Sequence, residues 1–336
     1  MPRTVLPDAR RSPRFSGIAT FMRYPRLADV LPENLPLDWA IYGVPFDSGV
    51  TYRPGARFGP RSIRDESQYI KRFHLGHNVD VCDRLSIADA GDAPVSPFSI
   101  ASTLDLIDDF TSELGDPVRT RLMAVGGDHS IAYANIRAAF ARAGEPRGGL
   151  ALVHFDSHLD TVDVVWGERF SHASPFRRAI EEGLVDPKRM LSIGIKGPLN
   201  SAEDLAFARG AGVTILTPDD LMRTPTIGPG ATERTPYGLR LSEVGAFVRR
   251  VGEAPAYVTF DVDVVDPAFA PGTGTPSIGG LTSAQALELI RELRGINLVG
   301  ADVVEVLPDR DVSGITALLA AQVMFELLAL DAVSRR

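Results

Sequence analysis

The chain has 336 residues, of which 44% are apolar and 23% are charged, and this composition excludes a mainly disordered protein. The net charge of −8, with no block of basic residues, argues against nucleic acid as a partner. The single cysteine, Cys82, excludes an internal disulfide and a thiolate zinc cluster, so a reducing cytoplasm is the expected location.

Residues 1–36 are rich in proline and arginine and show no helical or strand periodicity. We expect an N-terminal arm that either wraps the body of the protein or a neighbouring subunit, or stays a mobile terminus. This segment lacks the apolar core of a secretory signal. Because no repeat or linker divides the rest of the chain, we predict one large domain over residues 37–336.

Seven short, nearly continuous apolar runs follow, and each is typical of a strand that is buried on both faces. They are Ala40–Val44, Leu122–Val125, Leu150–Phe155, Met190–Ile195, Val213–Leu216, Ala256–Phe260 and Leu298–Val304. Helical patterns lie between them. This alternation predicts a three-layer α/β/α fold, in which a doubly wound, mainly parallel sheet lies between two layers of helices.

Three of the helical patterns have clear features. Ile131–Ala143 is followed by a glycine, and a later helix begins with a capping box at Thr282 and Gln285 and ends at Gly295. Ile315–Val333 is apolar on most of its faces. Such a helix has to be buried, either in this core or against another subunit, and we predict no membrane span.

Histidine and aspartate gather at the ends of three predicted strands. The segments are Gly126–Ser130 (GGDHS), His154–Asp160 (HFDSHLD) and Phe260–Pro267 (FDVDVVDP). Doubly wound sheets bind their ligands at the carboxyl ends of the strands, so these segments mark the expected site. Each segment alone is most often a turn or a helix cap, and it is their joint occurrence that indicates a site.

The spacing within these segments predicts a metal centre. Residues i and i+2 of an extended backbone lie on one face, so the acids and the second histidine of the middle segment converge, as do the first two acids of the last. Converging carboxylates repel one another unless a cation lies between them. This many ligands exceeds one zinc and suits two divalent ions, with Mn²⁺ favoured and Ni²⁺, Co²⁺ or Zn²⁺ left open. The six candidate ligands are His129, Asp156, His158, Asp160, Asp261 and Asp263.

Together with other segments, these motifs resemble the ureohydrolase family of arginases and agmatinases, and most closely its agmatinase-like branch. The likeness covers most of the chain. The matching segments, in the family's order, are Ile41–Arg64, Ser86–Asp92, Gly126–Ser130, Asp156–Asp160, Ser171–Arg178, Ser192–Gly197, Asp261–Gly280 and Val303–Pro308. The resemblance implies an arginase-like fold and the hydrolysis of a guanidino compound to urea and an amine.

The resemblance also implies how the metal ligands are shared. The two acids common to both ions would bridge them, and a hydroxide between the ions would be the nucleophile. The implied ligands are His129, Asp156, Asp160 and Asp261 for one ion, and Asp156, His158, Asp261 and Asp263 for the other.

Three catalytic roles follow from the same resemblance. Glu305 would bind the guanidinium, Asp160 would pass a proton to the leaving nitrogen, and His172 would exchange protons with solvent. Without the family, Glu305 is equally well explained as a strand-end ion pair and His172 as a loop residue. The family also implies a homo-oligomer, either a trimer or a hexamer of two trimers.

The substrate stays open, because the loop Thr161–Phe170 (TVDVVWGERF) that should line the entrance offers several kinds of contact. Asp163 or Glu168 would pair with the ammonium group of agmatine. Arg169 would pair with the carboxylate of guanidinobutyrate or a related acid. Trp166 would cover a small or alkylated guanidine or a biguanide. Alternatively, all four are ordinary residues of a variable surface loop.

Four residues depart from the agmatinase-like pattern: Ser157 replaces the usual Ala, Ala173-Ser174 replaces Gly-Thr, and Leu307 replaces a small residue. None is a candidate ligand, so these differences bear on the substrate. Two other functions compete with this one. A one-zinc deacetylase is disfavoured by the six ligands. A non-catalytic subunit, in a hetero-oligomer with an active paralogue, stays open because of the altered residues.

Overall fold

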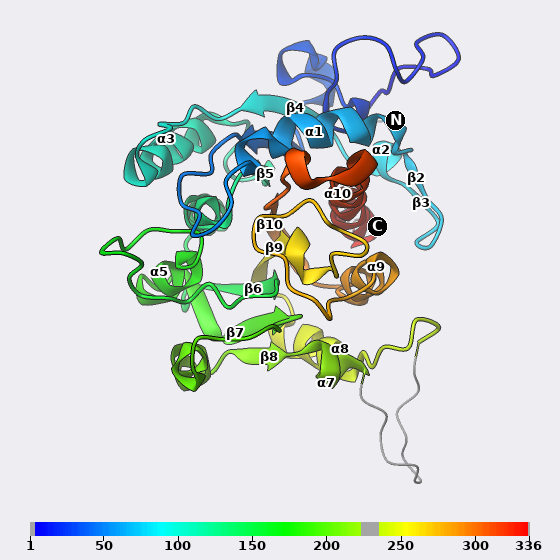
Figure 1. Ribbon diagram of the computed structural model, residues 1–336. Coiled ribbons are helices and arrows are strands. Elements are labelled where there is room, and N and C mark those ends of the chain that lie inside the picture. The colour runs from blue at the N-terminus through cyan, green and yellow to red at the C-terminus, as the bar shows by residue number, and fades with distance from the viewer. Residues whose placement is uncertain (1–3, 223–234, 335–336) are drawn as a thin grey trace.

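The computed structural model describes residues 4–222 and 235–334. Its strands are β1 Trp39–Val44, β2 Phe73–His74, β3 Val79–Asp80, β4 Ile87–Asp92, β5 Arg121–Gly126, β6 Leu150–Phe155, β7 Val185–Ile193, β8 Thr214–Leu216, β9 Pro255–Asp261 and β10 Asn297–Val304. Eight of them form one sheet in the order β4-β1-β5-β10-β9-β6-β7-β8, and all neighbours in it are parallel (Figure 1). The remaining two, β2 and β3, pair as a short antiparallel hairpin.

Helices cover both faces of the sheet. They are α1 Gly59–Glu66, α2 Val81–Arg84, α3 Ile100–Glu113, α4 Ala132–Arg142, α5 Pro175–Glu181, α6 Ala206–Ala211, α7 Pro218–Met222, α8 Ser242–Val251, α9 Ser283–Glu292 and α10 Ile315–Ser334. Side chains of β1 alternate between two buried apolar clusters: Trp39 and Ile41 belong to one, Ala40 and Tyr42 to the other. The first cluster includes side chains of α1, α8, α9 and α10, and the second includes those of α3 to α6. This arrangement confirms the predicted doubly wound α/β fold.

Most predicted strands of the large sheet differ from the structure by one residue at an end, and two of its strands differ by more. The strand β4, with the sequence IADAGD, was not predicted as a strand, because Ala, Gly and Asp have low strand propensity. The strand β7 begins at Val185, earlier than expected, and ends at Ile193 because Gly194 takes a φ of +97°. A positive φ breaks the extended backbone, and glycine adopts it without a steric cost.

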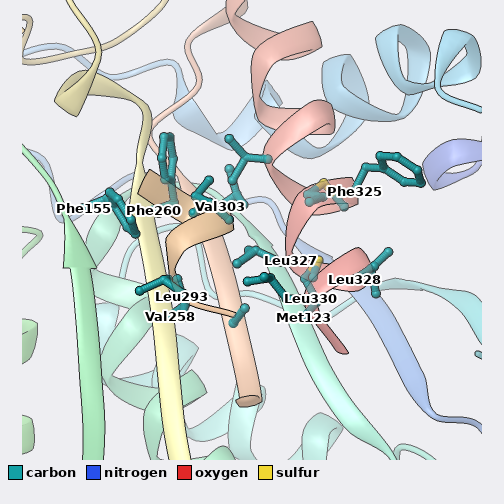
Figure 2. Packing of buried hydrophobic residues seen from close by; sticks show 14 of the residues in the cluster. Met123, Phe155, Val258, Phe260, Leu293, Val303, Phe325, Leu327, Leu328 and Leu330 are labelled. Carbon is teal, nitrogen blue, oxygen red and sulfur yellow. The ribbon is translucent and has the colours of Figure 1, made fainter. Parts of the chain in front are cut away.

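The C-terminal helix α10 lies in the first apolar cluster, as its apolar composition predicts. Its Leu327, Leu328 and Leu330 lie on the same side of the sheet as Met123 and Val303 (Figure 2). Among the described residues, one helix, Val312–Ser334, is long and apolar enough to cross a membrane by length and composition alone. However, 67% of its apolar window is buried inside the protein, as in a core helix.

The described part of the N-terminal arm wraps the body of the protein. Phe21, Met22 and Tyr24 are buried in the first apolar cluster. Nearer the N-terminus, the backbone N–H of Thr4 donates to the carbonyl of Cys82 at 3.1 Å, and the Thr4 hydroxyl donates to the carbonyl of Leu85 at 2.6 Å. These contacts attach the described part of the segment to the rest of the protein.

The order of the central strands determines where the functional side chains meet. The last strand, β10, lies between β5 and β9, and β6 lies next to β9. The carboxyl ends of these four neighbouring strands therefore form one continuous edge. Each of the three motif segments, and Glu305 as well, follows one of these ends.

Candidate metal centre

The first histidine of the cluster is buried among three carboxylates. Nδ1 of His129 lies 3.0 Å from Oδ2 of Asp156, 3.0 Å from Oδ2 of Asp160 and 3.5 Å from Oδ2 of Asp261. Although this nitrogen is buried, it makes no hydrogen bond with any described residue. Most buried polar atoms make a hydrogen bond, and this nitrogen makes none although three carboxylates surround it. A bound cation would interact with the nitrogen and with the carboxylates.

The second histidine lies on the other side of Asp156. Nδ1 of His158 is 3.4 Å from Oδ1 of Asp156 and 3.1 Å from Oδ2 of Asp263. The two oxygens of Asp156 therefore face the two histidines of the predicted ligand set. The structure brings all six predicted ligands together, at the strand edge where the sequence placed them.

Two carboxylates of the cluster are disfavoured as anions by their burial and by their acidic neighbours. Burial, together with Asp263 and Asp156, raises the pKa of Asp261 well above its usual range. Burial and the charge of Asp156 also raise the pKa of Asp160. Carboxylates in such a setting lose their charge unless cations neutralise them. The donor set, with four carboxylates and two imidazoles, therefore fits divalent metal ions.

The orientation of His129 is set by a hydrogen-bonded chain that the sequence analysis missed. Nε2 of His129 lies 2.8 Å from the hydroxyl of Thr259, which in turn donates to Asp302. The other oxygen of Asp302 accepts a hydrogen bond from Tyr257 at 2.8 Å. Because the Thr259 hydroxyl gives its proton to Asp302, it accepts from Nε2, which leaves the lone pair of Nδ1 directed at the carboxylates.

Two further residues of the cluster also escaped prediction. Nε2 of His154 lies 2.9 Å from Oδ2 of Asp156, and His154 is fully buried. The ammonium group of Lys196 donates to the Ser157 hydroxyl and to the carbonyl of Asp263, the latter at 2.9 Å. The Ser157 hydroxyl donates to the same carbonyl at 2.7 Å. The serine that departs from the family pattern therefore supports a predicted metal ligand instead of facing the substrate.

Glu305 follows β10 with a φ of +68° and points into the cluster. Its Oε1 accepts a hydrogen bond from the backbone N–H of His129 at 2.9 Å and lies 3.0 Å from Nδ1 of His172. Its Oε2 is buried and makes no hydrogen bond with residues 4–222 or 235–334. This leaves one acceptor available for a ligand.

The tautomer of His172 follows from its second contact. The backbone N–H of Thr51 donates to Nε2 of His172 at 2.9 Å. Because a backbone amide is only a donor, Nε2 is the acceptor, and Nδ1 carries the proton that bonds to Glu305. The His172 backbone N–H also donates to the carbonyl of Gly49 at 2.9 Å, which ties the same loop to the histidine.

A cavity of about 470 Å³ opens onto the cluster. Its base is formed by His158, Asp160, His172 and Asp261, and Trp166 lies at its mouth. We call the outer lining residues of the loops 161–170 and 198–204 the mouth of the cavity: Val162, Val165, Trp166, Pro198, Leu199, Asn200 and Asp204.

The other residues of the entrance loop are placed differently from Trp166. The carboxylate of Asp163 accepts a hydrogen bond from Arg178, whose side chain is 1% exposed. Arg169 pairs with Glu181 at 3.3 Å. These ion pairs tie the loop to α5 and give Asp163 a structural partner, and Asp163 does not line the cavity.

Comparisons with known proteins show similarity along most of the chain. The model of the arginase family matches residues 37–329. Guanidinopropionase from Pseudomonas aeruginosa is 46% identical over 328 residues, which cover 97% of this chain and 96% of that protein. Guanidinobutyrase from the same organism is 39% identical, with 96% of each protein covered. The structure of proclavaminate amidino hydrolase from Streptomyces clavuligerus matches with a TM-score of 0.83 at 39% identity, and covers 96% of this chain and 100% of that one.

Proposed function

The chain belongs to the arginase family, and from this premise we propose that it hydrolyses a small guanidino compound to urea and an amine, with two divalent metal ions. The observation that carries the proposal is Oε2 of Glu305, a buried carboxylate oxygen beside the ligand cluster that makes no hydrogen bond with a described residue. A guanidinium, a cation with several N–H donors, suits such an acceptor. The relatives named above carry the names of enzymes that act on guanidino compounds.

The metal ions would be held by the residues that the structure brings together. We assign His129, Asp156, Asp160 and Asp261 to one ion, and Asp156, His158, Asp261 and Asp263 to the other. When bound, the ions lower the pKa of coordinated water and so supply a nucleophile at neutral pH. The oxygen-rich donor set with two imidazoles favours Mn²⁺, with Ni²⁺ as the second candidate.

Glu305 would bind and orient the substrate. Its Oε2 would accept a hydrogen bond from the guanidinium and hold the reacting carbon next to the clustered carboxylates. Positioning the substrate in this way lowers the entropic part of the activation barrier. Its Oε1 is held by the backbone N–H of His129 and by Nδ1 of His172, so the carboxylate cannot rotate freely. His172 therefore acts first through the position of Glu305.

Proton transfer falls to two residues on the cavity wall. Asp160 turns Oδ2 to His129 and keeps Oδ1 to receive a proton and pass it to the leaving nitrogen. His172 would exchange protons with solvent through Nε2. Since Nε2 accepts a hydrogen bond from Thr51, this contact has to open before the exchange takes place.

We also propose that the protein works in the cytoplasm as a homo-oligomer, a trimer or a hexamer, with residues 37–336 as one catalytic domain. The presence of all six ligands and of Glu305 favours catalysis by this chain over a non-catalytic role beside an active paralogue. Light scattering of the purified protein, without any other subunit, measures its molar mass and therefore the number of chains in the oligomer.

The proposed function is tested by urea release from the purified chain, loaded with Mn²⁺ or with Ni²⁺. The substrates are agmatine, guanidinopropionate, guanidinobutyrate, arginine, free guanidine, alkylated guanidines and a biguanide. We expect urea from at least one of them, and none after chelation. Asp263→Ala should lose metal and turnover together, whereas the exposed Asp309→Ala should change neither. A metal-loaded protein that releases no urea from the whole panel would contradict the proposal.

A further inference from the structure

The mouth of the cavity exposes apolar side chains to solvent. Val162, Trp166 and Leu199 line it and are 44%, 82% and 40% exposed. Burial of large apolar side chains is favourable, so leaving them in water is unfavourable. A group of such side chains around one cavity therefore indicates a ligand that covers them.

Trp166 is also held in an unfavourable backbone conformation. Its φ is +52° and that of Gly167 is +89°, and the turn is closed by two hydrogen bonds of 2.9 Å between Val165 and Glu168. A two-residue turn with positive φ at both positions favours Asn or Asp before Gly, and a bulky residue there is an outlier. Strain of this kind is retained where function needs the side chain.

The entrance loop is anchored, so the position of Trp166 is defined. The backbone N–H of Val162 donates to the carbonyl of Ala173 at 2.9 Å, and Asp163 accepts from the buried Arg178. Both contacts lie before the turn and attach the loop to the segment that carries His172. The backbone that carries Trp166 is therefore tied to the body of the protein beside the cavity.

The polar groups of the cavity argue against a negatively charged substituent on the substrate. Asp204 lines the mouth, with Oδ2 held by the backbone N–H of Asn200 at 2.8 Å. Among the described residues that line the cavity, none is Lys or Arg. A substrate carboxylate would leave water and meet a charge of its own sign without a counter-ion.

We infer that the substrate is an N-alkylguanidine, whose uncharged alkyl group lies against Trp166 and Leu199 while its guanidinium reaches Glu305. The inference rests on the proposed function and deepens it. Water adds to the guanidinium carbon, and the bond from that carbon to the alkyl-bearing nitrogen breaks. The water oxygen becomes the urea oxygen, both water protons end on the leaving nitrogen, and the products are urea and an alkylammonium ion.

The test compares three substrates of similar length that differ in the charge of the tail: n-butylguanidine, agmatine and 4-guanidinobutyrate. The protein is loaded with Mn²⁺ and, in parallel, with Ni²⁺. We expect kcat/KM for n-butylguanidine to be at least tenfold above that for 4-guanidinobutyrate and no lower than that for agmatine. A preference for 4-guanidinobutyrate overturns the inference, and so does a preference for agmatine, which would assign the tail to Asp204. Absence of urea from every guanidine contradicts the proposed function instead.

Variants at the mouth separate recognition of the tail from catalysis. Trp166→Ala should raise KM for n-butylguanidine at least fivefold and leave free guanidine, which has no tail, unchanged. The matched control is Val164→Ala, in the same loop and 49% exposed but outside the cavity lining, which should change neither. Leu199→Arg should raise kcat/KM for 4-guanidinobutyrate. Equal effects of Trp166→Ala on both substrates would refute a role in tail recognition.

Tryptophan fluorescence gives a readout that does not depend on turnover. The chain has two tryptophans, and Trp39 is fully buried with its Nε1 bonded to Asp331 at 2.8 Å. Rapid mixing of the metal-loaded protein with n-butylguanidine should shift the emission of Trp166 to shorter wavelength before product accumulates. Trp166→Phe should abolish the shift. An unshifted spectrum at saturating n-butylguanidine overturns the inference.

Discussion

Replacing Thr259 by valine is expected to weaken metal binding without removing a ligand. The threonine hydroxyl is the link between Nε2 of His129 and Asp302. Valine keeps the shape and opens no cavity, but it leaves Nε2 without an acceptor, and the proton can then move to Nδ1, which faces Asp156 and Asp160. A nitrogen that carries a proton cannot bind a metal ion.

The magnitude follows from the general cost of losing an outer-shell partner, a 10- to 100-fold loss in metal affinity. This corresponds to about 1.4 to 2.7 kcal/mol. The fold itself should lose only about 1 kcal/mol, because Asp302 keeps its hydrogen bond from Tyr257.

Competition titration against a chelator of known affinity measures the dissociation constant of the metal in each variant. Thr259→Ser keeps the hydroxyl and should bind metal within about threefold of the parent, given the usual scatter of such substitutions. Thermal unfolding of the metal-free proteins checks that both variants are folded. A valine variant with the affinity of the parent would show that the chain from His129 to Asp302 does not orient the ligand.

Three further predictions concern the substrate, the core and the cysteine. Glu305→Gln should keep its metal content by elemental analysis and lose about 100-fold or more in kcat/KM, as expected when a charged group that orients the substrate is removed; near-parent turnover would remove Glu305 from the mechanism. Leu327→Ala, at a fully buried position of α10, should lower the free energy of unfolding by about 2 to 5 kcal/mol in urea titrations, and an unchanged midpoint would contradict the burial of this helix. Burial raises the pKa of Cys82 to about 12, so its thiol stays protonated at pH 8 and should react with a thiol reagent only after denaturation; fast labelling of the native protein would argue against this environment.

The candidate ligands were predictable because short segments place them directly after β5, β6 and β9. The two-residue period of extended backbone, from which their convergence was expected, does not align them in the structure. The strand β6 ends at Phe155, Asp160 has a φ of +51°, and Asp263 lies in the short 3-10 helix Val262–Val264. Their meeting with His129 depends on the order of the strands, which apolar runs do not encode. The resemblance to a known family supplied this information, because it implies that the three segments form one metal centre.

The residues that escaped prediction are those whose role arises from distant contacts. Thr259 lies inside an apolar strand. Its hydroxyl can link His129 to Asp302 only because the register of the neighbouring strand places Asp302 opposite. Asp163 seemed free to meet a substrate, because its pairing with Arg178 depends on the path of the loop. Buried polar residues inside predicted strands were the one available signal for such positions.

The position of β10 in the sheet has a consequence for biosynthesis. This strand is the last to leave the ribosome, yet it inserts between β5 and β9 and joins the two halves of the sheet (Figure 1). A nascent chain that stops before residue 297 therefore has two separate half-sheets with unpaired inner edges, which are prone to aggregate. Productive folding must wait for the completed polypeptide, and acquisition of metal by the finished centre becomes one of its final steps.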